Sequence, residues 1–150
     1  MNPKTILFLC SGNYYRSRFA ELLFNHMAPQ HAIAWTATSR GLALELGVNN
    51  VGPIAQATLA GLAARGVAVD DARFPLALRE SDLIGADHVV ALKREEHLPL
   101  MQRNFPRWVE RVEFWHVHDL DYALPHEALG SIEHNLIKLI ARLQDSVRAT

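Results

Sequence analysis

A chain of 150 residues with 49% apolar residues can bury one hydrophobic core and is too short for two ordinary domains, so we expect one domain spanning residues 1–150. Its 15 basic and 16 acidic residues leave a formal charge of -1, so the chain has no global electrostatic field of the kind that draws proteins to nucleic acids or anionic membranes. Any anion-binding site in this chain is therefore local.

The single cysteine, Cys10, excludes an internal disulfide bond. The apolar run at residues 5–10 is far shorter than the core of a signal peptide or a membrane span. We therefore expect a cytoplasmic protein without a membrane partner.

The first half of the chain begins with a strand, a loop and a helix. Residues 4–9 form a short β-branched and aromatic run of the kind that is buried on both faces of a parallel sheet. The next four residues break this pattern, and from Ser17 apolar side chains recur at helical spacing. The elements expected after this helix are a strand at residues 32–37, a loop over 38–52 and a helix over 53–66.

The second half of the chain continues the alternation of strands and helices. We expect strands at residues 86–92 and 109–117, and helices over residues 94–104 and 125–148. This order predicts an α/β fold, a three-layer α/β/α arrangement with a four-stranded parallel sheet and right-handed crossovers. Ligands of such folds bind at the carboxyl ends of the strands, which is where Cys10 falls.

The segment from Cys10 to Ser17 places a cysteine and an arginine, with five residues between them, at the junction of the first strand and first helix. A loop of this length can turn its N–H groups inward as an anion-binding nest, which the dipole of the following helix reinforces. Gly12 and Asn13 tolerate the left-handed backbone that such a turn needs. Arg16 offers a planar fork to two phosphoryl oxygens, and the same field favours the thiolate form of Cys10 as a nucleophile.

The other residues of this predicted phosphate-binding loop have alternative roles. Ser17 either donates a hydrogen bond to the thiolate or caps the helix. Tyr14 and Tyr15 either wall the pocket and stack on an aryl substrate, or obstruct it. Cys10 itself has the alternative of a small buried apolar side chain at the end of a strand. The predicted substrate-binding residues are Ser11, Gly12, Asn13, Tyr14, Tyr15 and Ser17.

Residues 6–21, I-L-F-L-C-S-G-N-Y-Y-R-S-R-F-A-E, resemble the phosphate loop of the low-molecular-weight protein tyrosine phosphatases, in which V-L-F-V-C-x-G-N-x-C-R-S-P-x-A-E is typical. Residues 38–41 and 86–97 also resemble segments of that family, so the similarity extends over nearly the whole chain. The resemblance implies a cysteine-dependent phosphomonoesterase with a phosphocysteine intermediate and no metal or other cofactor. Its substrate would be a phosphorylated protein or a small aryl phosphate, with inorganic phosphate as product or inhibitor.

The resemblance also implies an aspartic acid near the C-terminal end, which protonates the leaving oxygen and then activates water. In the family this residue usually precedes a proline, and this sequence has no Asp-Pro pair. Asp119 directly follows the predicted fourth strand, so we predict Asp119 as the acid and keep Asp121 as the alternative. Both can equally be solvated loop carboxylates.

Several residues depart from the family pattern. Tyr15 stands where most members have a second cysteine, and Arg18 replaces a proline, so we expect added positive charge that favours acidic phosphopeptides. A single cysteine argues against an arsenate reductase, because related reductases pass a disulfide along several cysteines. Because the Asp-Pro pair is missing, the second hypothesis is a phosphate-dependent binding or regulatory protein with weak or no turnover, and an arsenate reductase is the third.

Three weaker signals have a plain structural interpretation. His116 and His118 share a strand face, but no cluster of further ligands accompanies them, so we do not expect a metal site. The run from Lys93 to Glu96 is typical of a solvated helix start. Arg40 lies near the strand ends, where its side chain either faces the anion site or points away from it.

Overall fold

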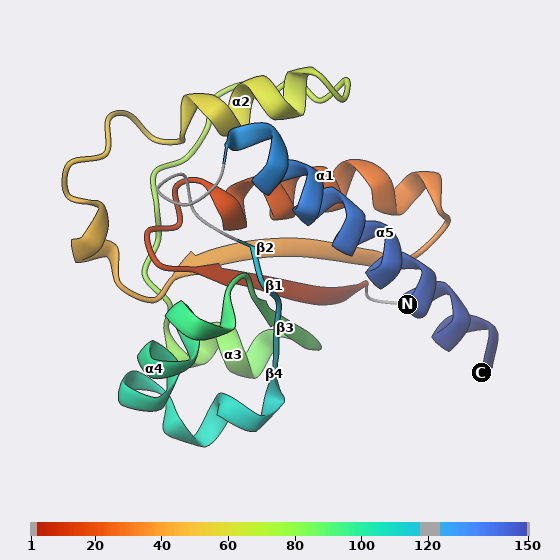
Figure 1. Cartoon of the computed structure of the whole chain (residues 1–150). Helices are drawn as coiled ribbons and strands as arrows, with labels where there is room; N and C mark the ends of the chain where they lie inside the picture. Colours follow the sequence, from red (N-terminus) through yellow and green to blue (C-terminus); the bar gives the residue numbers. More distant parts are fainter. Residues whose placement is uncertain (1–2, 118–123, 150) are drawn as a thin grey trace.

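The computed structural model describes residues 3–117 and 124–149. In this part of the chain, four parallel strands form one sheet in the order β2-β1-β3-β4 (Figure 1). The strands are β1 (Lys4–Cys10), β2 (Trp35–Gly41), β3 (His88–Ala91) and β4 (Val112–Phe114).

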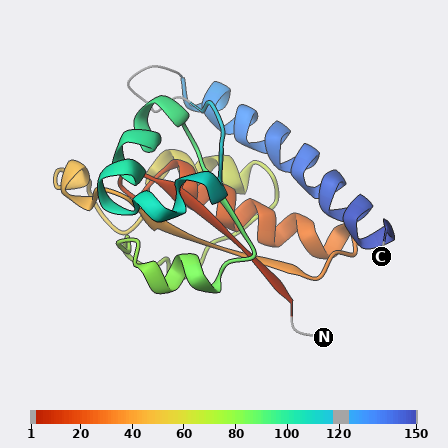
Figure 2. The ribbon, with the colours of Figure 1, turned by 90° about the horizontal axis from the view of Figure 1, so that it is seen from below.

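Helices cover both faces of this sheet, as Figure 1 and the view from below in Figure 2 show. One face carries α1 (Arg16–Gln30), α2 (Gln56–Ala63) and α5 (Pro125–Ala149), and the other carries α3 (Glu80–Gly85) and α4 (Arg94–Asn104). Two short 3₁₀ helices, η1 (Leu44–Gly47) and η2 (Pro106–Arg111), join these elements. The predicted three-layer α/β/α fold with a four-stranded parallel sheet is confirmed.

The central strand β1 separates two hydrophobic cores. Its side chains from Ile6 to Leu9 are fully buried, because both faces of the strand are covered. Ile6 and Phe8 face the core beneath α1 and α5, where Phe8 contacts Phe24 and Trp115. Leu7 and Leu9 face the core beneath α3 and α4. The continuous apolar run therefore holds the residues that follow Leu9 at the centre of one sheet edge.

The structure differs from the prediction at the end of the second strand and in one additional helix. The second strand continues through residues 38–41, which we expected to be a loop, because their backbone pairs in register with Leu7 to Cys10 and the pairing outweighs their polar composition. Helix α3 was not predicted: it has only six residues, too few to show a period, and its first turn is closed by a hydrogen bond from Arg79 N–H to Asp82 Oδ2 of 2.9 Å.

The predicted fourth strand is shorter than expected, because η2 replaces its first residues. Beyond β4 the chain still follows β3, since Trp115 N–H donates to Ala91 O and Val117 N–H donates to Leu92 O. This path brings Val117 to the same sheet edge as Cys10. No helix among the described residues has the length and apolarity needed to cross a membrane.

Candidate active site

The site is built where β1 and β2 end together. Cys10 is the last residue of β1 and pairs with Gly41, the last residue of β2. Directly after Gly41, the N–H groups of Leu42 and Ala43 donate to Cys10 O and Ser11 O, each at 2.9 Å. A Cβ atom on Gly41 would lie 2.8 Å from Ser11 O and 3.2 Å from Asn13 Cβ. Only glycine allows the chain after β2 to approach this closely, so Gly41 fixes the segment from Cys10 to Ser17, here called the 10–17 loop.

Asn13 holds the shape of the 10–17 loop. It has a left-handed φ of 50°, and its side chain is fully buried. Its amide nitrogen donates to Ser17 Oγ at 2.8 Å and to Ser39 Oγ at 2.9 Å, while its oxygen accepts from Arg73 Nη1 and from Leu76 N–H, both at 3.0 Å. These four bonds use the whole hydrogen-bonding capacity of the amide, so the side chain braces the loop.

Cys10 and Ser17 meet inside this loop. Cys10 Sγ lies 2.9 Å from Ser17 Oγ, and both side chains are buried. When the sulfur is a thiolate it can only accept, so the Ser17 hydroxyl is then the donor. The N-cap position of α1 is Tyr15, without a side-chain cap bond. Of the two roles considered for Ser17, the structure therefore supports contact with the sulfur.

Arg16 opens helix α1 and its side chain is 2% exposed. Its Nη1 donates to Val117 O at 3.0 Å, and its Nη2 lies 2.6 Å from Glu96 Oε2. The same Glu96 oxygen accepts from Ser11 Oγ at 2.6 Å and lies 2.9 Å from His97 Nε2. The sequence-distant helix α4 thus supplies a carboxylate to the 10–17 loop.

The charge of Glu96 is set by these neighbours. Burial raises its pKa, but the hydrogen bond from His97, the positive charge of Arg16 and the bonds from Ser11 and Arg16 outweigh burial and hold the pKa well below its usual value. Sequence reasoning missed this residue, because it interpreted the start of α4 as a solvated surface. Arg94 and Glu95 are indeed exposed, whereas Glu96 faces the loop. The sequence did contain one indication that Glu96 is near the site: it lies in the first turn of a helix that follows a parallel strand, and ligands bind at the carboxyl ends of such strands.

The two tyrosines of the loop have different surroundings. Tyr15 is 5% exposed and belongs to the core beneath α1 and α5. Tyr14 is half-buried, and its hydroxyl donates to Val51 O at 2.5 Å in an exposed contact. Of the two tyrosines, therefore, only Tyr14 lies at the surface.

Arg18 faces inward, so the expectation that it attracts acidic peptides at the surface is wrong. It is 2% exposed and donates to Pro53 O at 3.0 Å and to Arg73 O at 2.8 Å. Burial and the neighbouring Arg73 lower its pKa to about 10, which keeps the guanidinium charged at neutral pH. Arg18 thereby ties the first turn of α1 to two connecting segments.

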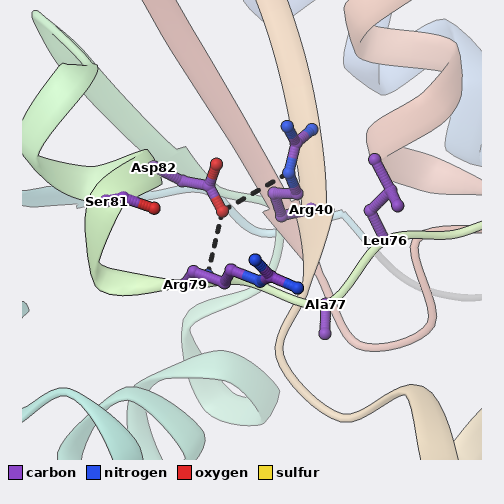
Figure 3. Close-up of a pocket in the computed structure, with 6 residues that line it drawn as sticks. All are labelled: Arg40, Leu76, Ala77, Arg79, Ser81 and Asp82. Carbon is purple, nitrogen blue, oxygen red and sulfur yellow. Dashed lines mark hydrogen bonds and ion pairs between the residues drawn. The ribbon is translucent and has the colours of Figure 1, made fainter.

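Arg40 lines a different pocket, of about 360 Å³, on the α3 side of the sheet. Figure 3 shows Asp82 between Arg40 and the backbone of Arg79, with a 3.4 Å ion pair from Arg40 Nε to Asp82 Oδ2. The Arg40 guanidinium contacts Thr38, Ser39 and Asp82, and no residue of the 10–17 loop lines this pocket.

The predicted acid and its alternative, Asp119 and Asp121, lie outside the described residues, as does His118. Val117, whose carbonyl oxygen contacts Arg16, precedes Asp119 by two positions. His116 is exposed, and within residues 3–117 and 124–149 no three His, Cys, Asp or Glu side chains are grouped so as to hold a metal ion.

Several known proteins are similar to this chain. The family model described as low molecular weight phosphotyrosine protein phosphatase matches residues 5–149. A low molecular weight protein tyrosine phosphatase from T. tengcongensis is 26% identical, with 95% of this chain and 99% of that chain covered and a TM-score of 0.73. No curated protein sequence matches this chain.

Two further structures share the fold at lower identity. YfkJ from Bacillus subtilis is 22% identical, with 96% of each chain covered and a TM-score of 0.82. Wzb from Vibrio vulnificus, in complex with benzylphosphonate, is 16% identical, with 93% of this chain and 98% of that chain covered and a TM-score of 0.78. With the family match over nearly all of its length, this chain belongs to the low-molecular-weight phosphotyrosine protein phosphatase family and is a cysteine-dependent phosphohydrolase of that type.

Proposed function

We propose that Cys10 is the nucleophile of this phosphohydrolase. Its Sγ attacks the phosphorus of the monoester, and the S–P bond forms as the P–O bond to the leaving oxygen breaks. The observation that carries the proposal is the 2.9 Å contact of Cys10 Sγ with Ser17 Oγ at the N-terminal end of α1. The hydroxyl and the helix dipole both stabilise a thiolate there, first as attacking group and then as leaving group.

The phosphoryl oxygens are held by Arg16 and by the N–H groups of the loop. A guanidinium carries five N–H donors, so the contacts of Arg16 with Val117 and Glu96 are compatible with a bidentate contact to an oxyanion. The side chains of Asn13 and Tyr15 lie in the protein interior. The remaining binding contributions are assigned to the backbone N–H groups of the predicted set Ser11, Gly12, Asn13, Tyr14, Tyr15 and Ser17.

Asp119 handles the proton in both steps. Its carboxylic acid protonates the leaving oxygen, and the resulting carboxylate then takes a proton from the water that attacks the phosphocysteine. The second step breaks the S–P bond and releases inorganic phosphate and the Cys10 thiolate. The position of Asp119, two residues after the Val117 carbonyl that contacts Arg16, supports this role.

The substrate we propose is a phosphotyrosine protein or a small aryl phosphate. The benzylphosphonate in the Wzb structure joins an aromatic ring to a phosphate-like group, which supports this class. The half-buried Tyr14 is the loop aromatic at the surface and can flank such a ring. We also infer that residues 1–150 act as one phosphatase domain in the cytoplasm, and the family match over residues 5–149 supports the extent of that domain.

The proposal is tested by p-nitrophenyl phosphate turnover with vanadate inhibition alongside. We expect the wild type to hydrolyse the ester and Cys10→Ser to lose hydrolysis while still binding vanadate. If the wild type shows no hydrolysis above the Cys10→Ser background although vanadate binds, the chain is a phosphate-binding protein and the catalytic proposal is wrong.

The assignment of the acid is tested by two matched variants, Asp119→Ala and Asp121→Ala. We expect the first to lower kcat by roughly a hundredfold or more, which is the usual contribution of general acid catalysis. The second removes a similar carboxylate two residues away and is therefore a matched control. It should change kcat by less than about threefold, because Asp121 is not the proposed acid. The reverse pattern would assign the acid to Asp121.

A further inference from the structure

Glu96 is the point where helix α4 meets the 10–17 loop. Its Oε2 lies 2.6 Å from Arg16 Nη2, 2.6 Å from Ser11 Oγ and 2.9 Å from His97 Nε2. The contacts join two loop residues that are five positions apart to one carboxylate oxygen about eighty residues further along the chain. The guanidinium is fixed on its other side by the Val117 carbonyl at 3.0 Å.

His97 lies directly beside this carboxylate, with its Nε2 2.9 Å from Glu96 Oε2. Its ring is fully buried, and its Nδ1 accepts a 2.9 Å hydrogen bond from the Lys93 N–H at the start of α4. Because Nδ1 is an acceptor in the neutral ring, the hydrogen is on Nε2, which faces Glu96 Oε2. The beginning of α4 thus fixes the His97 ring against the carboxylate.

These contacts separate two roles that a carboxylate beside a phosphate site can have. A general acid must hold a proton at working pH and release it to the leaving oxygen. Glu96 Oε2 instead faces three donors, one of them cationic, which is the surrounding of an ionised acceptor. Glu96 therefore cannot replace Asp119 as proton donor.

We propose that Glu96 is a positioning residue, which orients Arg16 for an oxyanion bound in the 10–17 loop. The inference rests on the proposed function, since it assigns Arg16 to the phosphoryl oxygens. A planar guanidinium binds two oxygens well only in one orientation. The contacts of its two terminal nitrogens with Glu96 and Val117 set that orientation before the substrate arrives.

The test compares Glu96→Gln with the matched control Glu95→Gln. Both changes neutralise a carboxylate in the first turn of α4, but Glu95 is exposed. We expect Glu96→Gln to lower kcat for p-nitrophenyl phosphate and to weaken inorganic phosphate binding, measured by calorimetry, each by about tenfold, because charge-assisted hydrogen bonds are lost. Glu95→Gln should leave both within about twofold.

A double-variant cycle with Arg16→Met tests whether Glu96 acts through Arg16. We expect phosphate to bind the double variant no more weakly than Arg16→Met alone. The inference is overturned if Glu96→Gln weakens binding equally in the Arg16→Met background. It is also overturned if Glu96→Gln binds phosphate as tightly as the wild type or more tightly, because the carboxylate would then only repel the anion.

Two further measurements keep these outcomes distinct. The pH profile of kcat should keep its limbs in Glu96→Gln and fall in height only, whereas loss of a general acid would remove the alkaline limb. Thermal unfolding checks that each variant is folded. If Glu96→Gln folds poorly, Glu96→Asp serves as a second variant. It keeps the charge and should bind phosphate more tightly than Glu96→Gln. If the wild type does not hydrolyse the ester, the proposed function fails, while the binding cycle still decides the role of Glu96.

Discussion

Replacing Asn13 with alanine removes the amide that braces the 10–17 loop. Four hydrogen bonds are lost, and two of them, to the hydroxyls of Ser17 and Ser39, lie between buried side chains. Alanine also has to adopt the left-handed φ of 50°, which costs about 1 kcal/mol. With about 1 kcal/mol for each buried hydrogen bond, we expect the free energy of unfolding to fall by about 3 kcal/mol.

Asn25 provides a matched control for this variant. Its side chain makes two hydrogen bonds to the backbone of Ala37, of 3.0 Å and 2.7 Å, but it is exposed and lies within α1. Water can replace these bonds, and alanine is the better helix former, so Asn25→Ala should cost less than about 1 kcal/mol. Urea unfolding of both variants measures the difference.

A second substitution separates the two causes. Asn13→Gly loses the same bonds but adopts a positive φ without strain, so it should recover about 1 kcal/mol relative to Asn13→Ala. Both variants should lower turnover, because the loop loses its support. Equal losses of stability in Asn13→Ala and Asn25→Ala would refute the argument that buried bonds hold this loop.

Three other predictions concern Gly41, Glu113 and Cys10. Gly41→Ala should reduce both stability and turnover, whereas Gly85→Ala, where an added Cβ meets nothing within 4 Å, should leave turnover unchanged in the same assay. The hydrogen bond from His88 and the bonds from an arginine and a tryptophan outweigh burial and lower the pKa of Glu113 to about 2. This folded-state pKa lies below the unfolded value, so Glu113 stabilises the fold above about pH 4.5 and loses this contribution as pH falls toward 2. Urea unfolding of wild type and Glu113→Gln across this range measures the effect. The difference in their free energies of unfolding should shrink as the pH falls. Peroxide should inactivate the enzyme by oxidising Cys10 without an internal disulfide, so mass spectrometry should find added oxygen on the Cys10 peptide, and activity that survives peroxide would contradict the role of Cys10.

The order of the main elements could be predicted because their signals are local. In residues 4–9 and in α5, the pattern of apolar residues within the segment itself indicates which side chains are buried. Helix α4 spans residues 94–104 as predicted. The end of β2 and the whole of α3 could not be predicted in this way. Each depends on a partner elsewhere in the chain, the backbone of β1 for β2 and the sheet surface for α3.

The same distinction explains the site. The 10–17 loop was recognised from its spacing, its glycine and its asparagine, because the turn is a property of that segment. The inward direction of Arg18 and the contact of Glu96 with Arg16 were not recognised, since a charged residue on a helix looks solvated until the opposite element is known. Arg18 also shows the risk of assigning a surface role from charge alone.

The site therefore combines a loop whose turn is set by its own residues with residues from distant parts of the chain that hold it. Gly41 and Asn13 fix the path of the loop backbone, whereas Glu96 and Val117 fix the direction of the Arg16 guanidinium. A change in the first group should alter stability and turnover together, since the loop would lose its shape. A change at Glu96 should reduce turnover and phosphate binding at a smaller cost in stability, because the backbone of the loop keeps its own bonds. Comparing unfolding free energy with kcat for Gly41→Ala and Glu96→Gln would show whether the two groups are separable in this way.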